Sequence, residues 1–144
     1  MTHTDTDYSN RANGELNVLV ARRQGWRVEE SPHNSALGRY CLIAPMQLLT
    51  EATRGRMTEA LAWEGVPNKP ADDANAALAL DFGNEMLTVL KTPPIGSVKP
   101  FFIAFVSKSD DTTEYHRTSA DSASRAITIA YLRYRDASER EAGQ

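Results

Sequence analysis

The sequence has a single cysteine, no long apolar run and no large excess of either charge. Cys41 alone cannot form an intrachain disulfide, and its apolar neighbours favour a buried, inert thiol. No apolar stretch is long enough to cross a bilayer, and residues 1–10 are polar, so we expect a cytoplasmic protein without a membrane partner. A net charge of −3 creates no field that attracts nucleic acid, which is therefore not expected as a partner.

The sequence also lacks the motifs of common catalytic and cofactor-binding sites. His3, His33 and His116 do not stand at ligand spacing from one another, from the cysteine or from a carboxylate, so no metal site is predicted. There is no Gly-x-Ser-x-Gly elbow, phosphate-binding loop or dinucleotide fingerprint. Asp81-Phe82-Gly83 matches one kinase motif by coincidence, since the other kinase motifs are missing. We therefore predict no catalytic residue, no cofactor and a function based on binding.

What is present is typical of one small α+β domain. Residues 1–12 are rich in Thr, Asp and Asn and predict a disordered leader, and residues 137–144 predict a frayed tail. The 144-residue chain is long enough to bury one core, so residues 13–136 are expected to form a single domain.

Periodicity and turn chemistry predict the elements of the first half. Apolar residues at helical spacing, followed by Gly25, predict a helix over residues 14–24. Alternation at 26–30 and an apolar run at 39–44 predict a β-hairpin whose loop Gly38 closes. In the weakly patterned segment 46–70, Thr58 is a candidate cap for a short helical turn.

The second half predicts a helix, a second hairpin and a closing helix. Asp72 or Asp73 caps a helix that we expect to end before Pro93. We expect residues 101–106 to form a fully buried strand, residues 113–117 to form its partner, and Ser119 to cap the last helix. The order α-β-β-α-β-β-α predicts an α+β fold in which helices pack on a mostly antiparallel sheet of about four strands.

The junction between the last predicted strand and the last helix is a candidate ligand site. A helix start attracts phosphate or carboxylate, and nearby arginines add charge-assisted hydrogen bonds. The alternative is a solvated strand end with an ordinary helix cap. The residues of this site are Tyr115, His116, Arg117, Ser119 and Arg125.

Arg22, Arg23 and Trp26 are a second candidate ligand site. A stacked guanidinium or an indole face can hold a nucleobase. The alternative is a core tryptophan beside a solvated arginine pair that compensates the helix dipole.

Several segments resemble the small phage-encoded "ABA sandwich" domains. They are Leu16–Ala21 leading into Gly25-Trp26, Ala62–Pro67 followed by Asp72–Ala77, and the Ala-rich closing helix. Together they cover most of residues 13–134, with a longer middle at residues 46–56. The resemblance implies a bacteriophage or prophage protein that acts in the host cytosol.

Small phage proteins without an enzyme motif often act by binding. The resemblance and the basic, aromatic junction at residues 115–125 together favour an anti-defence sponge that sequesters a cyclic or ADP-ribose-derived nucleotide. Because sponges commonly build their pockets across subunits, a homo-oligomer is expected. The alternative is an inhibitor that binds a host or defence protein, with an exposed connection around Arg54. A nucleotide hydrolase that uses His116 and a nearby carboxylate is a third possibility, supported only by residue type.

Overall fold

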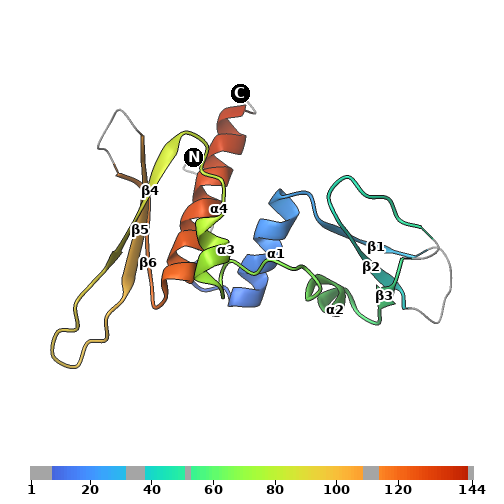
Figure 1. Cartoon of the computed structure of the whole chain (residues 1–144), viewed down its shortest axis with the longest axis horizontal. Coiled ribbons are helices and arrows are strands. Elements are labelled where there is room, and N and C mark those ends of the chain that lie inside the picture. The colour runs from blue at the N-terminus through green and yellow to red at the C-terminus, as the bar shows by residue number, and fades with distance from the viewer. Residues whose placement is uncertain (1–7, 32–37, 51–52, 109–113, 143–144) are drawn as a thin grey trace, which may run out of the picture. The chain divides into compact units, whose positions relative to one another are not determined.

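The computed structural model describes residues 8–31, 38–50, 53–108 and 114–142, which form an α+β fold (Figure 1). The predicted class is confirmed. The expected sheet of about four strands is corrected: the described residues form two antiparallel three-stranded sheets, β1-β2-β3 and β4-β5-β6. The chain divides into an insert unit, Asn17–Asn68, and a main unit, Met1–Leu16 with Lys69–Gln144. A single domain over residues 13–136 stays a prediction.

The insert unit contains the predicted hairpin and a short helix. The first helix, α1 (Asn13–Arg23), matches its predicted range within one residue at each end and enters this unit. The other elements are β1 (Arg27–Glu30), β2 (Tyr40–Ile43), β3 (Gly55–Arg56) and α2 (Glu59–Trp63). β1 pairs antiparallel with β2, which confirms the hairpin; its turn at 32–37 lies outside the described residues. The Thr58 hydroxyl accepts a hydrogen bond from the Leu61 N–H at 3.2 Å, which confirms that cap.

Gly38, just before β2, and Gly55, in β3, allow their two backbone segments to pass very close to each other. A Cβ atom on Gly38, whose φ is +104°, would lie 2.6 Å from the carbonyl carbon of Gly55. A Cβ atom on Gly55 would lie 2.4 Å from the carbonyl oxygen of Gly38. Both distances are shorter than side-chain carbons tolerate, so this crossing requires glycine at both positions.

In the main unit, one long helix covers one face of a sheet. The elements are α3 (Ala74–Leu78), β4 (Glu85–Lys91), β5 (Phe102–Lys108), β6 (Glu114–Ala120) and α4 (Ala123–Ala142). Ala104 and Val106 of β5 are fully buried, as are Ile127 and Ala130 of α4. α4 lies along this face, and no helix that the structure describes covers the outer face (Figure 1).

The helix predicted from Asp72 or Asp73 to Pro93 is corrected to a short helix and a strand. The Asp73 carboxylate accepts the Asn75 N–H at 2.9 Å, as a cap does, but α3 ends at Leu78. The Asp81 carboxylate then accepts the Gly83 N–H at 2.8 Å, and Gly83 takes a φ of +64°. This turn ends the helical periodicity, and residues 85–91 form strand β4, which pairs with β5.

The start of the last helix is also corrected. Ser119 lies in β6, where it pairs with Ile103, and α4 begins at Ala123. The capping contact comes from Ser122, whose hydroxyl accepts the Arg125 N–H at 3.2 Å. The reason is that the strand continues three residues further than its polar sequence predicts.

Near both ends of the described chain, residues contact or extend the main unit. Within the expected leader, Tyr8 is only 2% exposed, and its hydroxyl donates to the Asp136 carboxylate of α4. α4 continues through the tail predicted to fray as far as Ala142. Among the described residues, no helix combines the length and apolar character that crossing a membrane requires.

Candidate functional site

The predicted site at the β6 junction is only partly brought together. The rings of Tyr115 and His116 lie 6.3 Å apart, and the His116 ring lies 6.4 Å from that of Tyr134 on α4. The Arg117 guanidinium carbon lies 5.9 Å from the ring centre of Phe105 on β5. Ser119 is on the strand, away from a helix start. The junction thus offers aromatic and basic side chains without the helix dipole that the prediction assumed.

Arg125 holds the N-terminal segment of the main unit. Its guanidinium donates to the Asn13 side-chain oxygen at 2.7 Å and to the carbonyls of Ser9 and Arg11 at 2.8 and 2.6 Å. These contacts direct the guanidinium toward residues 9–13. A role for Arg125 in anion binding stays a prediction, and its observed contacts are structural.

Arg133, which the sequence did not single out, braces the irregular part of β6. The β5–β6 register shifts between Ala104 and Val106, and His116 has a φ of 57°. Arg133 donates to the carbonyl of Arg117 at 3.0 Å and to the Thr118 hydroxyl at 3.3 Å. The bulge is thus held by α4. An arginine in an Ala-rich helix carries no sequence signal for this role.

The three residues of the second predicted site have separate contacts. Arg22 lies over the ring of Trp63, with its guanidinium carbon 5.2 Å from the ring centre. A terminal nitrogen of Arg22 lies 3.9 Å from a carboxylate oxygen of Glu59. Arg23 donates to the Leu19 carbonyl at 3.3 Å. Trp26 packs against the core of the insert unit. The stacked aromatic is therefore Trp63 rather than Trp26, and these contacts join each of the three residues to a different partner.

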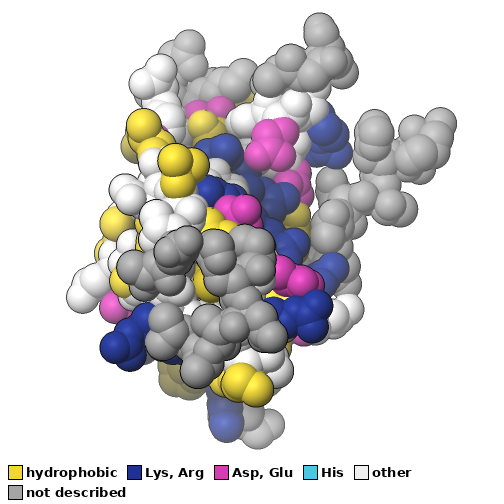
Figure 2. Space-filling view, turned by 90° about the vertical axis from the view of Figure 1, so that its right-hand side faces the viewer, with side chains coloured by type: hydrophobic (Ala, Val, Ile, Leu, Met, Phe, Trp, Pro, Cys, Tyr) yellow, Lys and Arg dark blue, Asp and Glu magenta, His cyan; other side chains and the backbone are white. Residues whose placement is uncertain are grey.

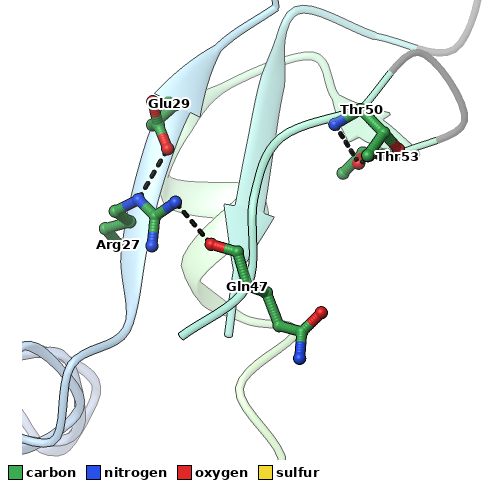
Figure 3. A network of polar contacts seen from close by, with 5 residues as sticks. All are labelled: Arg27, Glu29, Gln47, Thr50 and Thr53. Carbon is green, nitrogen blue, oxygen red and sulfur yellow. Dashed lines mark hydrogen bonds and ion pairs between the residues drawn. The ribbon is translucent and has the colours of Figure 1, made fainter. Parts of the chain in front are cut away.

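Beside Trp26, a polar network fixes the chain after β2 (Figure 3). Arg27 donates through Nε to the Glu29 carboxylate at 2.6 Å and through its terminal nitrogen to the Gln47 carbonyl at 2.7 Å. Further along, the Thr50 N–H donates to the Thr53 hydroxyl at 3.1 Å. These bonds use the polar groups locally and give this region a structural role.

A shallow, open hollow of about 330 Å³ lies between α4 and the turn before β4. Arg135 forms an ion pair with Glu139 at 3.7 Å, and Asp81 adds a second carboxylate. The Tyr134 hydroxyl approaches Gly83, where a Cβ atom would lie 2.7 Å from it. Charges of both signs therefore line the hollow. The described residues contain no group of three or more His, Cys, Asp or Glu side chains placed to hold a metal ion.

The hairpin formed by β4 and β5 exposes apolar side chains to an unusual degree. Five large apolar residues of this hairpin are between 38% and 70% exposed. We call them the hairpin surface: Met86, Leu90, Ile95, Val98 and Phe101. Large exposed apolar surfaces usually mark sites of interaction with another molecule.

From residue 86 to residue 108, every charged residue of this hairpin is a lysine. Residues 86–108 contain three lysines and neither aspartate nor glutamate, within a chain whose net charge is −3. Lys91 lies 5.9 Å from the ring centre of Phe102, and Lys99 is exposed near the tip. The hairpin is therefore a local basic and apolar region of an acidic protein.

The outer face of the sheet extends this surface. Because side chains alternate along a strand and Ala104 and Val106 face α4, the intervening residues of β5 face outward. The strand is therefore buried on one face only, which corrects the prediction of a fully buried strand. Ile103 stands opposite Leu90, and Phe105 stands opposite Thr88. Arg117 contacts Phe105 from β6.

Other surfaces of the protein carry mixed charge. On the face drawn in Figure 2, Lys and Arg side chains lie among Asp and Glu side chains, without a patch of one sign among the described residues. In the insert unit, Arg39 pairs with Glu30 at 3.0 Å and Arg27 with Glu29 at 2.6 Å.

Comparisons of the chain with protein-family models, curated proteins and solved structures found no match.

Proposed function

We propose that this is a non-enzymatic binding protein that docks another protein on the hairpin surface and the outer face of the β4-β5-β6 sheet. The observation that carries the proposal is that five exposed apolar side chains, with Lys99 exposed among them, lie within residues 86–108, which contain no carboxylate. Such a surface is complementary to a partner with an apolar patch flanked by Asp or Glu. The resemblance to phage-encoded domains supports a host or defence protein as that partner.

The extent of the surface favours a protein over a bilayer. Its exposed apolar residues run from Met86, at the start of β4, to Phe101, at the start of β5. A bilayer would take up the hairpin tip, whereas a protein can cover the tip and the strands together. Burying one such side chain completely contributes about 1.5–3 kcal/mol, so a few of them suffice for a stable complex.

Capture from host lysate by three forms of the full chain tests this function. The wild type and Met57→Ser, which changes an exposed apolar residue of the insert unit, are expected to retain the same acidic protein in equal amount. Ile95→Ser/Val98→Ser is expected to lose it, and Lys99→Glu to weaken it when the purified pair is titrated. Equal retention by the double variant, or no stoichiometric partner for the wild type, would overturn the proposal.

Binding of a small nucleotide is the second candidate, favoured by the hollow at Arg135. The Arg135 guanidinium and the Tyr134 hydroxyl can contact a phosphate, and the His116 ring lies next to Tyr134. Asp81 and Glu139 oppose an anion at the same place, which is why protein binding is preferred. Calorimetric titration with cyclic nucleotides and ADP-ribose checks this: heat that disappears in Arg135→Gln supports it, and no heat removes it.

A further inference from the structure

The free edge of β4 has the properties of a strand that pairs with another strand. β4 is seven residues long, contains no proline or glycine, and lies at one edge of its sheet. Among the described residues, Met86–Lys91 form no backbone hydrogen bond with a segment other than β5. Leu87 and Val89 face α4 yet stay half-buried, whereas Val106 on the neighbouring strand is fully buried. Long, regular, uncovered edges of this kind readily pair.

The opposite edge of the sheet differs. β6 carries a bulge at which the register with β5 shifts, and His116 has a left-handed φ of 57°. A bulge twists an edge and interrupts its row of hydrogen-bonding groups. β4 is therefore the edge suited to pairing.

The β4–β5 register shows which backbone groups face outward. The Thr92 N–H donates to the Phe101 carbonyl at 2.8 Å, in the same register as the strands. Hydrogen-bonded and non-hydrogen-bonded pairs alternate in antiparallel sheets. The Glu85 N–H donates to the Phe82 carbonyl, outside the sheet, so it does not point toward β5. This is the direction that the alternation predicts for Glu85. The residues whose N–H and C=O face the free edge are therefore Leu87, Val89 and Lys91.

Two copies of β4 can pair in one register that both forms the edge hydrogen bonds and places opposite charges across from each other. If a two-fold axis passes beside Thr88, two β4 strands pair antiparallel and Thr88 stands opposite its own copy. Glu85 then stands opposite Lys91 of the second copy, and the same ion pair recurs across the axis. Leu87 stands opposite Val89 as a hydrogen-bonded pair, and Met86 opposite Leu90. Shifting the register by two residues in either direction separates both charge pairs while keeping the hydrogen bonds.

We propose that the protein is a homodimer in which two β4 strands pair antiparallel about Thr88, so that two sheets become one sheet of six strands. This pairing would bring the outer faces of both copies onto one side of the joined sheet. Opposite charges and a Thr–Thr pair directly across the strands favour this register. The dimer goes beyond the proposed function and does not depend on it.

Crosslinking of the full chain tests the register. In antiparallel non-hydrogen-bonded pairs the Cα atoms lie about 4.5 Å apart, which a disulfide can bridge. Under mild oxidation, Thr88→Cys is expected to form a covalent dimer, whereas Leu90→Cys alone is not. A mixture of Met86→Cys and Leu90→Cys is expected to crosslink. The native Cys41 is buried, and the wild type serves as the control. Equal crosslinking of Thr88→Cys and Leu90→Cys would overturn the register.

Charge reversal tests the same dimer without a crosslink. Sedimentation equilibrium is expected to give twice the monomer mass of 15.9 kDa for the wild type. Lys91→Glu places like charges opposite each other at two symmetric positions, so we expect about tenfold weaker dimerisation or more. Glu85→Lys/Lys91→Glu is expected to recover it. A monomeric wild type, or a double variant no tighter than Lys91→Glu although equally folded, would overturn the proposal.

Discussion

The two three-stranded sheets differ in strand length and in what their side chains contact. β1, β2 and β3 have four, four and two residues, whereas β4, β5 and β6 have seven each. In the first sheet, arginines are paired with nearby glutamates. In the second, one face packs on α4 and the other exposes apolar side chains, with Arg117 over the ring of Phe105. The first sheet thus has ion pairs between residues close in sequence, while the second has an exposed apolar face.

Gly55→Ala is expected to have the largest effect and to disrupt the first sheet. Its Cβ atom would lie 2.4 Å from the Gly38 carbonyl oxygen, and backbone must move to relieve this contact. We expect a loss of about 3 kcal/mol in unfolding free energy. Amide hydrogen exchange should show it in residues 27–56, with β4–β6 much less affected. Gly14→Ala is the control, because no atom lies within 4 Å of its Cβ atom and alanine favours a helix.

Val106→Ala is expected to weaken the second sheet on its α4 side. The Val106 side chain is fully buried, and its truncation leaves a cavity between β5 and α4. We expect a loss of about 2 kcal/mol, measured by chemical denaturation. Ser107→Ala, on the outward face of the same strand, should change stability by less than about 0.5 kcal/mol. Equal losses at the two positions would contradict the assignment of the faces.

Ile95→Ser is expected to have the smallest effect on folding. Ile95 is 70% exposed in the connection between β4 and β5, so its apolar contacts in the single chain are few. The unfolding free energy should change by less than about 0.5 kcal/mol in thermal or chemical denaturation. A loss above 1.5 kcal/mol would mean that this side chain supports the fold, and would weaken the comparison between the two sheets.

The elements with a local sequence signature were predictable. Helical spacing and Gly25 located α1, alternation located β1 and β2, and the apolar run at 101–106 located β5. The largest error was β4, because Leu80, Gly83 and Leu87 fit a helical face. The signals against it were Asp81 followed by Gly83, a turn pattern, and the β-branched pair Thr88-Val89.

The candidate site was less predictable because its features depend on contacts distant in sequence. Arg125 was expected to bind an anion near Ser119, yet its guanidinium contacts residues 9–13, over 110 positions away. The absence of acidic residues from 86–108 is visible in the sequence. This absence indicates a binding surface only if these residues form an exposed hairpin. The sequence instead predicted a helix over the first part of this range.

The contacts of Arg125 have a consequence for the order in which the chain can fold. Asn13 and Arg125 are 112 positions apart, and Tyr8 and Asp136 are 128 apart, so these contacts require nearly the whole polypeptide. In the insert unit, Glu30 and Arg39 are only 9 positions apart. Contacts close in sequence form sooner than those that close a long loop. During synthesis, residues 17–68 can therefore pair while the ribosome still holds the sequence that completes the main unit.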